Sequence, residues 1–130
     1  MAERNTPWKD GELISVPLAA SVTVEAGKMV SVNSAGNAIP AADTASTIVV
    51  GVAQESVTNG TTAGAVSVVV RRGKAFLMAN GTTAVTQADV GGNVVVQDAA
   101  TVTTAAAATN DIVAGKCLGI ETGGVWVLIG

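Results

Sequence analysis

The residue types on which most enzymes depend are scarce in this chain of 130 residues, which has no histidine, no tyrosine and one cysteine, Cys117. Without histidine, the chain lacks the commonest general base, the imidazole ligand of metal sites and the usual activator of a cysteine nucleophile. Cys117 lies in an apolar stretch between Lys116 and Leu118. We therefore predict that it is a packed core thiol and not a nucleophile.

The acidic residues and the Gly-Lys pairs also lack the spacing of a known site. The ten carboxylates are scattered and do not follow the pattern of a metal-binding loop. A phosphate loop needs Ser or Thr after its lysine, whereas Met29, Ala75 and Cys117 follow the three Gly-Lys pairs. Two facing carboxylates can hydrolyse glycosides, so a hydrolase stays as an alternative, although no pair of acids is favoured by its spacing. We predict no catalytic residue, no cofactor and no metal.

Composition excludes several other classes of partner. The net charge is −3, and charged residues make up 13% of the chain, against about 25% in an ordinary soluble domain. A negative chain gains nothing from nucleic-acid phosphates, so we expect no nucleic-acid partner. The apolar runs are far shorter than the ~20 residues of a spanning helix, and residues 1–12 are polar, so we expect neither a membrane partner nor a signal peptide. The low charge favours burial against neighbouring proteins, and the lone cysteine fits synthesis in a reducing cytoplasm.

The pattern of apolar residues predicts an all-β fold. Val, Ala, Thr and Gly dominate, and short apolar runs alternate with turns rich in Gly and Asn. No stretch repeats apolar residues at helical spacing. We expect a compact β-sandwich or barrel of about ten short strands, including segments 13–18, 22–24, 29–32, 48–53, 66–70, 75–78, 94–96, 116–120 and 125–129. Strand alternation also predicts that Phe76 and Trp126 are buried.

Two halves of the chain follow the same plan, which indicates an internal duplication. In residues 24–70, an apolar run after a Gly turn is followed by small residues, a Gly-containing strand with an acid beyond it, and a last apolar run. Residues 89–129 show the same order of segments. We therefore predict a single β domain over residues 13–130, with repeat halves at 24–70 and 89–129. A duplicated β unit favours a structural role over a catalytic one.

Residues 1–12 differ from the rest and are predicted to form an extended N-terminal arm. They hold five of the charged residues and show no periodicity. An indole on an arm is useful only where it packs, so Trp8 is the expected anchor of a partner contact, with Arg4 and Lys9 beside it. The chain has one basic cluster, which consists of Arg71, Arg72 and Lys74. This cluster is either a solvated hairpin end or a second contact with an acidic neighbour.

Five segments of the chain carry a family resemblance: residues 10–14, 24–32, 50–53, 88–96 and 118–129. In their order and spacing they resemble the small capsid cement, or head decoration, proteins of bacteriophages. The resemblance implies a compact β domain without catalytic residues that binds the major capsid protein on the outer surface of an expanded head. It also implies self-association at local symmetry axes, with a homotrimer favoured over a homodimer. The polar arm before Asp10 departs from the family pattern.

We therefore expect a structural virion protein, made in the bacterial cytoplasm, that stabilises the expanded capsid through many modest contacts. The alternative is a carbohydrate- or receptor-binding β module of a phage tail or fibre. That alternative requires an exposed aromatic platform, which the predicted burial of Phe76 and Trp126 would remove.

Overall fold

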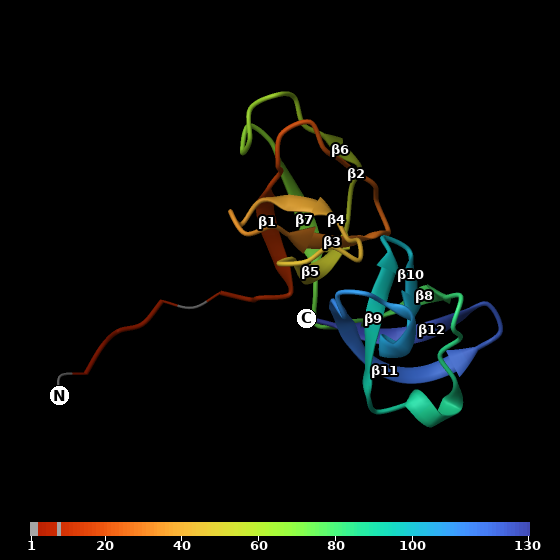
Figure 1. Cartoon of the computed structure of the whole chain (residues 1–130). Helices are drawn as coiled ribbons and strands as arrows, with labels where there is room; N and C mark the ends of the chain where they lie inside the picture. Colours follow the sequence, from red (N-terminus) through yellow and green to blue (C-terminus); the bar gives the residue numbers. More distant parts are fainter. Residues whose placement is uncertain (1–2, 8) are drawn as a thin grey trace.

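A computed structural model describes residues 3–7 and 9–130 of the chain (Figure 1). The described residues form twelve strands and two single-turn 3-10 helices, so the predicted all-β fold is confirmed. There are more strands than expected, because several pairings involve only two or three residues. The strands gather into two lobes, one before and one after Arg72, and an extended N-terminal segment projects away from both (Figure 1).

The first lobe is a five-stranded antiparallel sheet with a small two-stranded ribbon beside it. The sheet has the order β1-β7-β5-β3-β4, and β2 pairs with β6. The strands of this lobe are β1 (Leu13–Pro17), β2 (Thr23–Val24), β3 (Met29–Val32), β4 (Ala38–Pro40), β5 (Ile48–Ala53), β6 (Val57–Thr58) and β7 (Ser67–Arg71). One parallel bridge from Leu18 to Ala38 links the two edges of the sheet. Alternate residues point into a core that includes Val16, Val68 and Val70.

The second lobe is a closed barrel with the strand order β10-β8-β12-β11-β9. Its strands are β8 (Lys74–Asn80), β9 (Asn93–Asp98), β10 (Thr101–Thr103), β11 (Val113–Glu121) and β12 (Gly124–Ile129). The short helices η1 (Gln87–Asp89) and η2 (Ala105–Ala107) lie in its connections. The inward side chains are mostly Val, as at Val94, Val96, Val125 and Val127. A five-stranded barrel is too narrow for larger residues at every inward position, which explains this composition.

The two lobes repeat one topology. In chain order, β1, β3, β4, β5 and β7 of the first lobe take the places of β8, β9, β10, β11 and β12 in the second. The parallel bridge from Leu18 to Ala38 corresponds to the parallel pairing of β8 with β10, which closes the barrel. The predicted repeat halves, 24–70 and 89–129, each leave out the first strand of the repeated unit. That strand is β1 in the first lobe and β8 in the second.

A β-bulge occurs at the same place in both lobes. In the first lobe, Val30 is opposite Gly51, and the register then shifts. In the second lobe, Val94 is opposite Gly115, and the register shifts at the same step. Both positions require glycine, because a Cβ at Gly51 would lie 2.6 Å from the carbonyl oxygen of Arg71, and a Cβ at Gly115 would overlap the carbonyl oxygen of Leu128.

The turn that leads into this bulged pair is also repeated. Gly27, with φ of 82°, donates its N–H to the carbonyl oxygen of Ala53 at 2.8 Å. Gly91, with φ of 91°, donates to the carbonyl oxygen of Cys117 at 2.8 Å. Since L-residues rarely adopt a positive φ, glycine is favoured at both turns. The matching hydrogen bonds show that Ala53 and Cys117 hold equivalent positions.

The lobes are joined by packing and by hydrogen bonds. Met29 and Val52 of the first lobe lie in the same buried cluster as the barrel interior. The Met29 N–H donates to the carbonyl oxygen of Ala99 at 2.7 Å. The Asp43 carboxylate accepts N–H bonds from Thr109 at 2.8 Å and Asn110 at 2.9 Å. These contacts hold the two lobes together.

Candidate functional site

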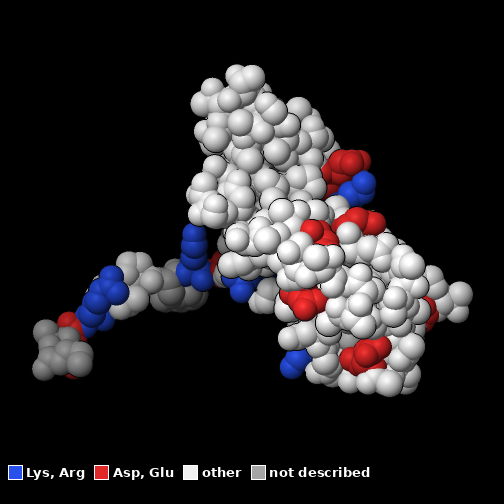
Figure 2. Space-filling view, viewed as in Figure 1, with Lys and Arg blue, Asp and Glu red and all other residues white. Residues whose placement is uncertain are grey.

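Two surfaces are candidates for binding a partner, and the first is the N-terminal arm with its base. Every described residue from 3 to 11 is exposed, and the arm extends away from the lobes (Figure 1). Figure 2 shows basic side chains along the arm, while most of the visible face of the first lobe has no charged residue. Arg4 donates to the Thr6 hydroxyl at 3.4 Å, and Lys9 is exposed. Trp8 lies outside the described residues.

The base of the arm is held by ion pairs at the junction of the lobes. Glu12 pairs with the Arg71 guanidinium, and its carboxylate also lies 3.5 Å from the Lys74 ammonium. The Arg72 N–H donates to the Glu12 carbonyl oxygen at 2.8 Å. The Arg72 guanidinium donates to the carbonyl oxygen of Gly130 at 2.9 Å. The basic cluster is thereby engaged within the chain, so its first role is to hold the arm to both lobes.

The interpretation of this cluster as a hairpin end was wrong. β7 pairs with β1 and β5, whereas β8 pairs with β12 and β10. Residues Arg72 and Gly73 therefore form the crossing between the two lobes, not a hairpin turn. The sequence pattern of two strands around a Gly turn does not distinguish these cases, because the choice of partner strands depends on distant residues.

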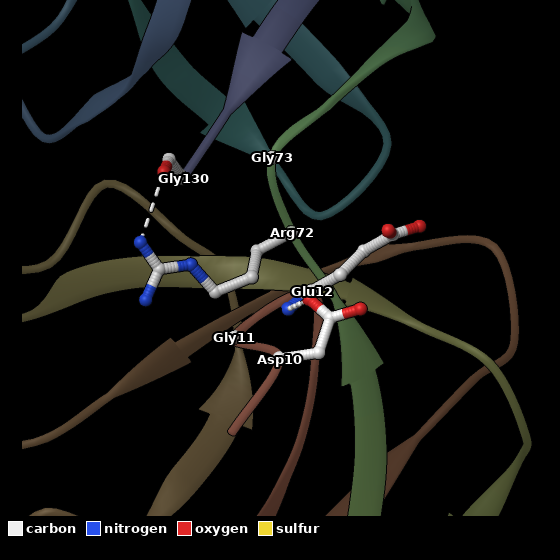
Figure 3. Close-up of a pocket in the computed structure, with 6 residues that line it drawn as sticks. All are labelled: Asp10, Gly11, Glu12, Arg72, Gly73 and Gly130. Atoms are coloured by element: carbon white, nitrogen blue, oxygen red, sulfur yellow. Dashed lines mark hydrogen bonds between the residues drawn. The ribbon is translucent and has the colours of Figure 1, made fainter. Parts of the chain in front are cut away.

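A hollow of about 330 Å³ lies at this junction. It is lined by Asp10, Gly11, Glu12, Arg72, Gly73 and Gly130 (Figure 3). In Figure 3 the Arg72 side chain reaches across to Gly130, while Asp10 and Glu12 come from the base of the arm. The lining side chains carry both signs of charge, and of the two carboxylates Glu12 is already paired with Arg71 and Lys74, while Asp10 is exposed. The arrangement suits polar contact better than catalysis.

The second candidate surface is an apolar patch on the barrel, which we call the barrel face and which sequence reasoning missed. It consists of Leu77 on β8, Leu118 on β11, and Trp126 and Leu128 on β12. Their exposed fractions are 45%, 47%, 38% and 38%, respectively. Contiguous apolar side chains at this level of exposure mark interaction surfaces in soluble proteins. The Trp126 indole N–H donates to the Glu121 carboxylate.

The prediction that Trp126 is buried was wrong, whereas Phe76 is half-buried and packs against the barrel core. Along β12 the inward residues are Val125, Val127 and Ile129, and alternation turns Trp126 outward. The sequence carried a signal, because three β-branched residues alternate with Trp126 and Leu128, which are not β-branched. A narrow barrel selects the β-branched set for its interior.

The ionisable groups of the described residues give little sign of chemistry. Cys117 is fully buried, and burial raises the pKa of its thiol, which agrees with a core role. Backbone hydrogen bonds from Thr109 and Asn110 lower the pKa of Asp43. No group of three or more His, Cys, Asp or Glu residues within 3–7 and 9–130 is placed to hold a metal ion. Among the same residues, no helix is long and apolar enough to cross a membrane.

Comparisons with known proteins add no relative to this picture. No protein-family model, no curated protein sequence and no solved structure matches the chain. The functional argument therefore depends on the two surfaces, the arm with its base and the barrel face, and on the chemistry of the residues that form them.

Proposed function

We propose that this chain is a structural virion protein that binds the outer surface of a phage head and stabilises the expanded capsid. The observation that carries the proposal is the exposed, charged N-terminal arm, which leaves a rigid base and extends away from both lobes (Figure 1). Such a segment buries almost no surface against its own chain. The conformational entropy that it loses on becoming ordered must therefore be offset by contacts with a partner. The major capsid protein is the proposed partner.

The fixed base gives the arm a defined starting direction. The Glu12 carboxylate is engaged by two cations, and its side chain is 29% exposed. A preorganised attachment point lowers the entropy lost when the arm binds. On a capsid lattice, each copy needs only modest affinity, because a copy that holds neighbouring capsomers acts through effective concentration.

The two lobes fit a bridging role better than a catalytic one. Only Glu25, Lys28, Asp43 and Glu55 carry charge between residues 13 and 70. A surface with so little charge tolerates close packing against neighbours at a small desolvation cost. The repeated five-stranded unit also offers two similar shapes to a capsid surface built from repeated subunits.

The exposure of Trp126 favours a second candidate, a carbohydrate- or receptor-binding module of a phage tail or fibre. An exposed indole can stack on a sugar ring. However, Leu77, Leu118 and Leu128 surround this indole, whereas a sugar site needs polar groups that match the hydroxyls. The apolar surroundings favour contact with protein.

Cosedimentation with expanded and unexpanded phage heads tests the proposal. We expect the intact chain to bind expanded heads and to raise the temperature at which they release DNA. Removing residues 1–9 or replacing Trp8 with Ala should weaken binding at least tenfold, since the first change removes most of the arm, the second removes its expected anchor, and neither alters the Glu12 pairs. Ile48→Ser, at an exposed position on β5, is the control and should bind normally.

Three results would change the conclusion. Equal binding by the arm-deleted chain removes the arm from the mechanism. Failure of the intact chain to bind any head refutes the capsid proposal. Retention on a glycan array that is lost in Trp126→Ala would instead establish the carbohydrate-binding alternative.

A further inference from the structure

The barrel face is a contiguous surface on three neighbouring strands. Leu77 on β8 is directly opposite Trp126 on β12, and Leu128 lies two residues further along β12 on the same side. Leu118 is the bulged residue of β11 beside Trp126. Leu77 also covers Gly124, since a Cβ there would lie 2.8 Å from its Cδ1 atom. The result is an apolar surface, curved with the barrel and centred on β12, without an internal partner among the described residues.

The first lobe provides an internal reference for this surface, because the strand pairings of the two lobes match each residue of the barrel face with an equivalent residue of the first lobe. Arg71 holds the place of Leu128, since Val52–Arg71 corresponds to Lys116–Leu128. By the same registers, three of the positions that are apolar in the barrel face are polar in the first lobe: Ser15 for Leu77, Gln54 for Leu118 and Arg71 for Leu128. The repeated fold therefore forms with polar residues at these positions. Folding alone does not account for the apolar residues of the second lobe.

Charged residues of opposite sign bound the barrel face along β11. Lys116 lies beside Leu128 at one end, and Glu121 lies beside Gly124 at the other. Neither side chain takes part in an ion pair among the described residues. A two-fold axis in the plane of the face and perpendicular to the strands would exchange these ends. Each Lys116 would then meet the Glu121 of the other copy.

We propose that the barrel face binds a second copy of this chain in a two-fold symmetric dimer, with the strands of the two barrels antiparallel across the interface. A second copy is the occupant that fits, because it supplies both an apolar face of equal size and the complementary charges in the required order. The other orientation, with the axis parallel to the strands, would place β11 of one copy over β8 of the other, so Lys116 and Glu121 would not meet. The proposal goes beyond capsid binding and does not depend on it.

The size of the face sets the expected affinity. With ~3.3 Å per residue and ~4.8 Å between strands, three strands of about six residues span roughly 20 by 15 Å. That is about 300 Å² per copy and about 600 Å² in total, roughly half of what a stable interface buries, so a weak dimer with a dissociation constant of about a millimolar is expected. Sedimentation equilibrium of the purified chain, without heads, up to about 2 mM should show the onset of a monomer–dimer equilibrium of 12.8 kDa subunits.

Substitutions taken from the first lobe test the apolar part of the interface. Leu77→Ser with Leu118→Gln introduces the residues that the first lobe carries at these positions, and should raise the dissociation constant at least about 30-fold with the fold retained in circular dichroism. Ile48→Ser removes a more exposed apolar side chain elsewhere, and should leave the equilibrium unchanged. If Ile48→Ser raised the dissociation constant of the dimer as much as Leu77→Ser with Leu118→Gln, the assignment of the interface to the barrel face would be overturned.

Charge reversal tests the symmetry. Lys116→Glu and Glu121→Lys should each weaken the dimer, and the double variant should restore it to within about threefold, because the pairs re-form with opposite polarity. In a Trp8→Phe background, Trp126 emission should shift to shorter wavelength as concentration rises. A monomer at all concentrations, a trimer, or a double variant weaker than both singles would overturn the proposal.

Discussion

A single methyl group at Gly115 should destabilise the protein more than one at any nearby glycine of the same strand. A Cβ at this position would overlap the carbonyl oxygen of Leu128 and lie 2.9 Å from both the carbonyl carbon of Leu128 and Cγ1 of Val127. The obstructing atoms are mostly backbone of the paired strand, which cannot rotate away. β12 would have to move away from β11 at Gly115, the same residue that forms the shared bulge with β9.

The expected cost follows from this geometry. Overpacking a core costs about 1–3 kcal/mol, and overlap with backbone belongs at or above the upper limit, so Gly115→Ala should lower the free energy of unfolding by about 3 kcal/mol. For a chain of this length, that change lowers the melting temperature by roughly 10 °C. Gly51→Ala, with its nearest obstruction at 2.6 Å, should have a smaller effect of the same sign.

Urea unfolding followed by far-UV circular dichroism measures the effect, and Gly119→Ala is the matched control. Gly119 is on the same strand, but a Cβ there meets nothing within 4 Å. The control should be neutral or stabilised by up to about 1 kcal/mol, because alanine loses less backbone entropy than glycine on folding. If Gly115→Ala proves as stable as Gly119→Ala, the close approach of Gly115 on β11 to the backbone of Leu128 on β12 is wrong.

Three further predictions concern single side chains. Glu12→Gln should lower stability by about 1 kcal/mol, an effect that shrinks in 1 M salt, whereas Glu25→Gln, which breaks an exposed pair with Lys28, should cost less than about 0.5 kcal/mol; chemical unfolding at both ionic strengths compares them. Hydrogen bonds from Thr109 and Asn110 lower the pKa of Asp43 in the folded protein below its usual value of 3.8. The ionised carboxylate therefore stabilises the folded protein above pH 3.8, and this stabilisation is lost as the pH falls through the pKa of the folded state. The melting temperatures of the wild type and Asp43→Asn should therefore differ near neutral pH and converge in acid. A difference in melting temperature that does not change with pH would contradict the hydrogen bonds from Thr109 and Asn110 to the Asp43 carboxylate. Cys117 should react with a thiol reagent only as fast as the protein unfolds, so rapid labelling of the native chain would contradict its burial.

The sequence was sufficient for the fold class, and the absence of histidine could be read from it directly. Short runs of Val and Ile between Gly turns could only pack as strands, and no histidine was present to support the usual catalysts or metal sites. The similarity of the two halves was also visible, because a repeated unit needs glycine at the same tight turns, as at Gly27 and Gly91. These features are local, so they can be inferred without knowing which strands pair.

Tertiary structure alone decided which surfaces are available to a partner. Along β12 two sets of apolar residues alternate, and closure of the barrel buries the set that includes Val127 and exposes the set that includes Trp126. Likewise, Arg71 and Lys74 resembled the free end of a hairpin until strand pairing placed them on opposite sides of the crossing, against Glu12. Local pattern determines that a residue lies in a strand, but the side it faces and the charge it meets depend on pairings between residues far apart in the chain.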